Sequence, residues 1–185
     1  MFATSELIHN DHPLDLSIAH SATYVHGMTD ELSTTTSPYT SGSGYDLGPI
    51  SPAVRERLAE RLTSEERHIL LDHGTERPFC GVLLDNKERG TYACRLCGLP
   101  LFKAGDKFDS RTGWPSFFKP FDEAHVRTLE DRSHGMLRTE TRCARCKSHL
   151  GHVFPDGPPP TGRRYCMNSA ALEFFPERVS PPQLA

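Results

Sequence analysis

Two closely spaced cysteine pairs constrain the fold of this chain more than any other feature of its sequence. Two residues separate Cys94 from Cys97 and Cys143 from Cys146, and 45 residues lie between the pairs. Two residues between thiols allow a tight turn to direct both sulfurs at one ion, and two such turns complete the tetrahedral set that structural zinc prefers. The spacing therefore predicts one zinc ion per chain, held by these four cysteines.

The C-x-x-C pattern has a second reading, because redox dithiols use it as well. Zinc is favoured because there are two pairs and no thioredoxin-like βαβ pattern around them. Four thiolates leave no open position for a water molecule, which argues against a zinc hydrolase. We therefore expect the zinc to be structural and to close the long loop between the pairs.

The charge of the chain excludes some classes of partner. The 185 residues carry a formal net charge of −3, without the basic surface that a nucleic-acid backbone requires. No apolar run approaches the roughly 20 residues that span a bilayer. Residues 1–54 contain no Lys or Arg, which signal and transit peptides need. We therefore expect a cytoplasmic protein with no nucleic-acid or membrane partner, and thiols stay reduced in that compartment.

Composition divides the chain into four parts. Residues 1–50 form an acidic leader with the low-complexity stretch STTTSPYTSGSG, which we expect to be flexible. Residues 51–62 form a connecting helical segment. The main folded domain is expected at residues 63–178, followed by a tail at residues 179–185.

Helix signals occur early in the chain. Ser51 and Pro52 are a typical N-cap and first-turn proline. Thr63 and Glu66 form a capping box, and Gly74 is expected to end that second helix.

Strand signals follow after the helices. Short apolar runs between turn residues predict strands at residues 81–85, 90–94, 136–143 and 163–175. In the third run, Leu137, Thr139 and Thr141 alternate with charged residues, the period-two pattern of a half-buried strand. A small β-rich domain is therefore expected behind one or two helices.

Five further segments resemble one enzyme family. They are HGTERPF (73–79), FDSRTGWPSF (108–117), EDRSHGMLRTE (130–140), HLGHVFPDGPPPTG (149–162) and RYCMNSAAL (164–172). In this order, they resemble the B-type methionine-R-sulfoxide reductases from about residue 60 to 176. The resemblance implies a mainly β fold of two small antiparallel sheets with a zinc clip, preceded by one or two helices. It also implies reduction of the R epimer of methionine sulfoxide, usually in oxidised proteins or peptides, with thioredoxin as the reductant.

Cys166 belongs to neither cysteine pair and follows two arginines and a tyrosine. Reducing a sulfoxide requires a soft nucleophile, and a thiolate next to a cation suits this task because the cation lowers its pKa. Arg164 matches the family's R-Y-C element and is the candidate cation, whereas Arg163 alternates to the opposite face of a strand. We therefore predict that Cys166 attacks as an anion; the alternative is a buried, inert thiol.

The remaining site residues come mainly from the resemblance. His149 and His152 offer the proton donor, with a pKa suited to neutral pH, although either histidine could instead hold a turn. Asn168 stands two residues beyond Cys166, so on a strand the two side chains share a face. Trp114 is implied to pack against the sulfoxide's methyl group, with Phe154 as a helper, and the alternative for each is ordinary core packing.

One departure from the family concerns the second thiol. Many relatives carry a cysteine just before GWPSF, where this chain has Arg111 and Thr112. The remaining thiol is Cys80, so we predict a Cys80–Cys166 disulfide after Cys166 has become a sulfenic acid. The alternative is a spectator Cys80, with an external reductant acting on the sulfenic acid. A zinc-stabilised protein-interaction module would explain the cysteine pairs equally well, but it would leave Cys166 and the histidines without a purpose.

Overall fold

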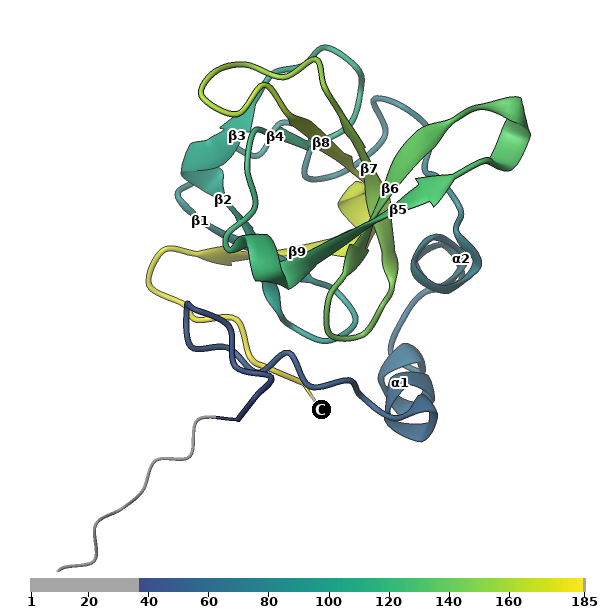
Figure 1. Cartoon of the computed structure of the whole chain (residues 1–185), viewed down its shortest axis with the longest axis vertical. Coiled ribbons are helices and arrows are strands. Elements are labelled where there is room, and N and C mark those ends of the chain that lie inside the picture. Colours follow the sequence, from purple (N-terminus) through teal and green to yellow (C-terminus); the bar gives the residue numbers. More distant parts are fainter. Residues whose placement is uncertain (1–36, 185) are drawn as a thin grey trace, which may run out of the picture. The chain divides into compact units, whose positions relative to one another are not determined.

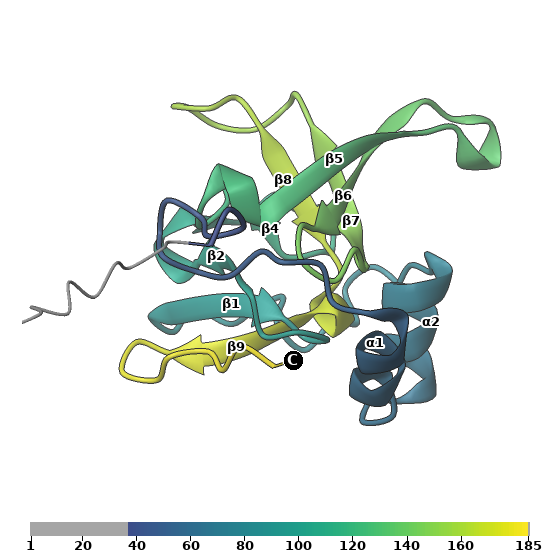
Figure 2. The same cartoon turned by 60° about the horizontal axis from the view of Figure 1, so that its bottom comes forward.

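Two antiparallel sheets and two short helices make up the part of the chain that the computed structural model describes, residues 37–184 (Figures 1 and 2). The helices are α1 (Pro52–Ala59) and α2 (Ser64–Asp72), and the strands are β1 (Gly90–Cys94), β2 (Pro100–Lys103), β3 (Lys107–Phe108), β4 (Ser116–Phe117), β5 (Val126–Asp131), β6 (Arg138–Cys143), β7 (His149–Phe154), β8 (Arg164–Met167) and β9 (Leu172–Pro176). The larger sheet has the order β3-β4-β8-β7-β6-β5, and the smaller has the order β2-β1-β9. The expected mainly β fold with two antiparallel sheets is confirmed.

The helices begin as their sequences predict. The Ser51 hydroxyl accepts from the N–H of Val54, and the capping box between Thr63 and Glu66 is complete. Helix α2 ends at Asp72, two residues before the predicted Gly74, because His73 takes the left-handed conformation with φ 59°. Gly74 is needed for a different reason: a Cβ there would lie 2.4 Å from the His68 ring.

The predicted strand at residues 90–94 is confirmed as β1, but two other runs differ. Residues 81–85 form turns, in which Val82 is 84% exposed and the carbonyl groups of Leu83 and Leu84 accept from Lys107. The run at 163–175 is two strands in different sheets, β8 and β9, separated by a short 3-10 turn at Ser169–Ala171. That turn carries the chain from the larger sheet to the smaller one.

The predicted alternation along β6 is wrong in detail. Glu140 and Thr141 are both buried, Thr139 is exposed, and Leu137 lies before the strand and is 70% exposed. The physical reason is that the Glu140 carboxylate is drawn inside by three basic side chains, which are described below.

Aromatic side chains from both sheets form the core. Phe102 of β2 stacks on Phe117 of β4 with ring centroids 4.4 Å apart, and Tyr92 of β1 packs edge-on against Phe117 at 5.0 Å. Tyr165 of β8 joins them, and all four side chains are almost completely buried. At about 1.5–3 kcal/mol for each large apolar side chain buried, this cluster is a principal source of stability. It also fixes β8, the strand that carries Cys166.

Residues 37–50 lie against the domain, which differs from the flexible leader expected over residues 1–50. The Ser41 hydroxyl is buried and donates to Nε2 of His125 at 2.9 Å. Tyr45 packs edge-on against the rings of Phe121 and His125. The rest of the expected leader, residues 1–36, lies outside the described residues.

Near the other end, the Leu184 N–H donates to the Cys97 carbonyl at 3.0 Å, so this part of the predicted tail is anchored as well. Within residues 37–184, no helix has both the length and the apolar character needed to cross a bilayer.

Candidate active site and metal centre

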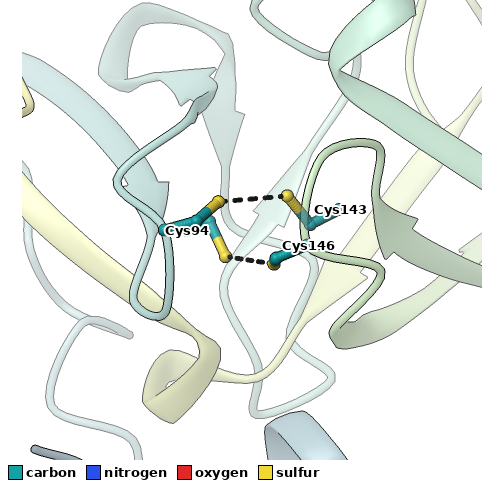
Figure 3. A group of neighbouring side chains, drawn as sticks. Cys94, Cys143 and Cys146 are labelled. Carbon is teal, nitrogen blue, oxygen red and sulfur yellow. Dashed lines mark hydrogen bonds between the residues drawn. The ribbon is translucent and has the colours of Figure 1, made fainter. Parts of the chain in front are cut away.

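Four buried cysteines meet between the two sheets. The Sγ atoms of Cys94 and Cys146 lie 3.5 Å apart, those of Cys97 and Cys143 lie 3.6 Å apart, and all four fall within 4.8 Å of one another (Figure 3). These separations exceed the roughly 2.05 Å of a disulfide. They are close to the spacing of about 3.8 Å that a tetrahedron with Zn–S bonds of about 2.3 Å gives. The cluster can therefore hold a tetrahedral metal ion.

The two cysteine pairs sit on equivalent turns. In the first, the Gly98 N–H donates to the Cys94 carbonyl at 2.8 Å; in the second, the Lys147 N–H donates to the Cys143 carbonyl at 2.9 Å. Gly98 and Lys147 both have positive φ, 73° and 62°. This repeated backbone turn directs two thiols from each side at the same point. Because all four cysteines are buried, a redox partner cannot reach them, which weighs against the redox-dithiol reading.

Cys166 lies at the centre of the larger sheet, on strand β8. Alternation along β8 sends Tyr165 and Met167 into the core, with exposures of 1% and 0%, and leaves Arg164 and Cys166 half-buried on the other face. In the sheet register, Cys166 stands opposite His152 of β7 on one side and Ser116 of β4 on the other. Residues directly opposite each other have Cβ atoms about 4.5–5.5 Å apart. The thiol is therefore accessible and next to an imidazole.

A chain of three hydrogen-bonded hydroxyl groups leads to the sulfur of Cys166. The Thr112 Oγ1 atom lies 3.8 Å from Cys166 Sγ and 2.8 Å from the Ser110 hydroxyl, which in turn lies 2.7 Å from the Ser116 hydroxyl. Thr112 stands directly before the GWPSF segment. In this chain, that position supplies a hydrogen-bond donor to the thiol.

The groups around Cys166 have opposing effects on its ionisation. Burial raises the pKa of the Cys166 thiol above its ordinary value, and this effect outweighs hydrogen bonds from Thr112, the positive charge of Arg164 and a bond from Ser116, which all lower it. Arg164 acts in the predicted direction but does not prevail. Its charge is shared with Asp156 through two bonds of 2.9 Å, and its guanidinium lies 4.5 Å from the centre of the Phe154 ring. Phe154 thus packs against Arg164.

A β-bulge brings the two histidines together. On a regular strand His149 and His152 would point to opposite faces, but the register shifts between Thr141 and Arg142, so Leu150 is an extra residue on β7. The two imidazole rings consequently lie 5.5 Å apart. Sequence spacing alone gave no sign of this bulge.

Each histidine donates to a carboxylate. His152 Nε2 lies 2.8 Å from Asp131 Oδ2, and His149 Nδ1 lies 2.7 Å from Glu140 Oε1. Because a carboxylate only accepts, both of these ring nitrogens carry hydrogen. His149 Nε2 is buried and has no hydrogen-bond partner among the described residues. Burial lowers the pKa of His149 despite its bond to Glu140, so this imidazole is neutral at pH 7 with a free lone pair on Nε2.

Glu140 was missed by the sequence reading. Besides His149, it accepts from His73 Nδ1 at 2.9 Å and from Arg142 at 2.8 Å. Burial raises the pKa of Glu140, but its bonds to Arg142, His149 and His73 prevail and lower the pKa to about 2. A charged amino acid in an alternating strand would have been read as solvent-facing, so no sequence signal identified it.

Asn168 does not take the predicted place beside Cys166. Strand β8 ends at Met167, and Asn168 is only 3% exposed. Its amide Nδ2 donates to the Leu150 carbonyl, and its Oδ1 accepts from the Glu76 N–H, both at 3.1 Å. Asn168 therefore holds the bulge that brings the histidines together.

Glu76, which the sequence reading also missed, links three parts of the site. Its carboxylate accepts from the N–H groups of Ser169 at 2.6 Å and Ala170 at 3.0 Å, while its carbonyl accepts from the indole N–H of Trp114 at 3.2 Å. Trp114 is half-buried in the loop before β4, and the next residue, Pro115, accepts from the Met167 N–H. The predicted indole wall is thus held next to strand β8.

Cys80 is exposed, and the residues on either side of it contact the site. The Phe79 N–H donates to the Gly113 carbonyl at 2.8 Å, and a Cβ at Gly81 would lie 2.2 Å from the Ser169 hydroxyl. Phe79 has φ 65°, a conformation that costs a non-glycine residue energy. The segment around Cys80 is therefore strained and touches both the Thr112 loop and the turn after Cys166.

Comparison with known proteins assigns the family. Residues 62–176 match the SelR domain. The chain is 64% identical over 141 residues to "Peptide methionine sulfoxide reductase MsrB" of Xylella fastidiosa (strain M23), covering 76% of this chain and 91% of that protein. Proteins of the same name from Caulobacter vibrioides (strain NA1000 / CB15N) and Thiobacillus denitrificans (strain ATCC 25259 / T1) are 63% and 56% identical, covering 72% and 68% of this chain and 84% and 96% of their own lengths. The chain therefore belongs to the SelR-domain family of MsrB peptide methionine sulfoxide reductases, and it is an oxidoreductase.

Proposed function

We propose that this enzyme reduces the R epimer of methionine sulfoxide in oxidised proteins and peptides, with Cys166 as the nucleophile. The proposal rests mainly on the surroundings of Cys166, which is the one half-buried thiol among residues 37–184. An imidazole stands opposite it in the sheet, and the Thr112 hydroxyl group lies 3.8 Å from its sulfur. The enzyme class comes from the family, and the assignment of roles rests on this geometry.

In the first step, the Cys166 sulfur attacks the sulfur of the sulfoxide, and the substrate's S–O bond then breaks as the oxygen moves to Cys166. The oxygen is transferred to Cys166, which becomes a sulfenic acid, while the methionine sulfur is reduced by two electrons. The thiol proton of Cys166 ends on the transferred oxygen, so no other proton source is consumed. His152 and His149 are placed to carry this proton, because one stands opposite Cys166 and the other has a free Nε2 lone pair.

Trp114 is proposed to pack against the methyl group of the sulfoxide. The supporting observation is that its indole is anchored to the Glu76 carbonyl while its loop touches the thiol through Thr112. A rigid apolar wall next to the sulfur would favour a thioether-derived substrate.

In the second step, the Cys80 thiol attacks the sulfenic sulfur. A Cys80–Cys166 disulfide forms, and the hydroxyl group leaves as water with the Cys80 proton. Support comes from the contacts of Phe79 and Gly81, which place Cys80 between the Thr112 loop and the turn after Cys166. A dithiol protein of the thioredoxin class then reduces the disulfide and restores both thiols.

The four buried cysteines are proposed to hold one zinc ion. A bound ion would link the two turns and take no part in the reaction, because four thiolates fill its coordination shell. Cys94 belongs to β1 in one sheet and Cys143 to β6 in the other, so the site joins the sheets.

The test supplies the purified protein with the separate R and S epimers of a blocked methionine sulfoxide and dithiothreitol. Loss of the R epimer alone is expected in the wild type, and no loss is expected in Cys166→Ser. A Cys80→Ser variant should turn over with dithiothreitol but not with thioredoxin. Full thioredoxin-driven turnover by Cys80→Ser would refute the resolving role of Cys80 but would not affect the assignment of Cys166 as the nucleophile.

A further inference from the structure

A cavity of about 570 Å³ lies beside the site, and of its lining residues only Trp114 has a proposed part in the reaction above. Its walls come from Phe79, from residues 84–87, from Ala104, Lys107 and Phe108, and from the loop at 109–115. Ligand pockets have volumes of roughly 300–1,000 Å³. The cavity is therefore large enough for more than the side chain of a single methionine sulfoxide.

The cavity and the reactive thiol share one loop. Thr112 lies 3.8 Å from Cys166 Sγ, while its neighbours Arg111 and Gly113, together with Trp114, line the cavity. An extended peptide advances about 3.3 Å per residue. A peptide whose oxidised methionine is at Cys166 therefore has its neighbouring residues within reach of the cavity.

The wall opposite this loop is held in place by a lysine. Lys107 Nζ donates to the carbonyl groups of Leu83 and Leu84 at 2.7 Å and of Asn86 at 2.6 Å. These bonds fix the turn at residues 83–87 without any ligand. Because this wall is already ordered, binding of a peptide does not have to offset the entropy cost of ordering it.

The lining combines apolar surface with free charges of both signs. Phe79, Phe108 and Trp114 supply aromatic surface. Asp85, Lys87 and Arg111 are exposed, and none of these three has an ion-pair partner within residues 37–184. Apolar surface with charges of both signs suits a polypeptide of mixed sequence, whereas a phosphate backbone would require basic side chains only.

We propose that this cavity binds the residues that flank the oxidised methionine in a polypeptide substrate. The inference rests on the proposed function, because it assumes that the methionine sulfoxide sits at Cys166. It adds a peptide subsite in which Asp85 favours a basic flanking residue.

The experiment compares three substrates containing the same methionine-R-sulfoxide. One is the single residue blocked at both ends, and two are octapeptides with either lysine or glutamate on both sides of it. The test variant is Asp85→Lys. The matched control is Glu88→Lys, which makes the same charge change three residues away at an exposed position outside the cavity lining.

Asp85→Lys is expected to lower kcat/KM for the lysine-flanked peptide roughly three- to fivefold, as an exposed charge pair allows. It should raise kcat/KM for the glutamate-flanked peptide and leave the blocked residue within about twofold, and Glu88→Lys should change none of the three. Equal effects of Asp85→Lys on all substrates, or no effect on any, would overturn the inference. If the wild type reduces none of the three substrates, the proposed function itself fails, which is a distinguishable result.

Discussion

Thr112→Val tests how the protein controls the ionisation of Cys166. Valine keeps the shape of threonine but removes the hydroxyl group that lies 3.8 Å from the sulfur. Hydrogen bonds to charged groups contribute about 1.5–3 kcal/mol and neutral ones about 1 kcal/mol, and the long separation places this bond at the lower end. Losing about 1 kcal/mol reduces the thiolate fraction about fivefold, since 1.36 kcal/mol corresponds to one pKa unit.

The assay is alkylation of Cys166 by iodoacetamide in a Cys80→Ser background, with peptide mapping to confirm the modified residue. The other four cysteines are buried, so Cys166 is the thiol expected to react. At pH 7.5, Thr112→Val should react about fivefold more slowly than the background protein, on the scale of one such hydrogen bond. Thr128→Val serves as the control because Thr128 is exposed on β5.

The pH dependence gives a second readout of the same reasoning. Because burial raises the pKa of Cys166, the alkylation rate of the background protein should still be rising at pH 9.0, the ordinary value for this group. A rate that levels off well below that pH would show that Arg164 dominates over burial. An unchanged rate in Thr112→Val would refute the role given to the hydroxyl group.

Three other predictions follow from the structure. Chelation of the metal, or serine at any one cysteine of the cluster, should lower the melting temperature and release one zinc per chain, measured by calorimetry and metal analysis; unchanged melting would contradict a structural role. Glu76→Ala should lower the free energy of unfolding by roughly 2–4 kcal/mol, because the buried N–H of Ser169 and the half-buried N–H of Ala170 lose their acceptor, and should shift the fluorescence of Trp114; the exposed Glu65→Ala should do neither. Burial lowers the pKa of His125 below its unfolded value of 6.5. The stability that the neutral imidazole contributes is therefore present above pH 6.5 and is lost as pH falls through the folded pKa. Urea unfolding at several pH values should show a smaller loss of unfolding free energy at acid pH in His125→Gln than in the wild type. The same dependence of unfolding free energy on pH in both proteins would contradict this role of His125.

Much of the fold could be predicted because local chemistry determined it. The capping box at Thr63 and the cysteine spacing each describe one turn of backbone and its immediate partners, and both predictions agree with the structure. The run at 163–175 could not be divided correctly, because the break between β8 and β9 depends on Glu76, more than ninety residues away in sequence, accepting from Ser169 and Ala170.

The arrangement of the site was predictable in part for the same reason. Cys166 was identified by the residues beside it, and its half-open face follows from alternation along a short strand. The bulge at Leu150 was not predictable, since it depends on Asn168 from the neighbouring strand segment. Burial of Glu140 also depends on tertiary partners, which a single sequence does not reveal.

The central claim is that Cys166 takes the oxygen from the R epimer. The most direct measurement mixes the Cys80→Ser variant with one equivalent of each epimer of a blocked methionine sulfoxide, without reductant, and traps sulfenic acid with dimedone before mass spectrometry. The account predicts one adduct on Cys166 for each methionine released from the R epimer, and none with the S epimer. Methionine release without modification of Cys166, or an adduct on another cysteine, would contradict it.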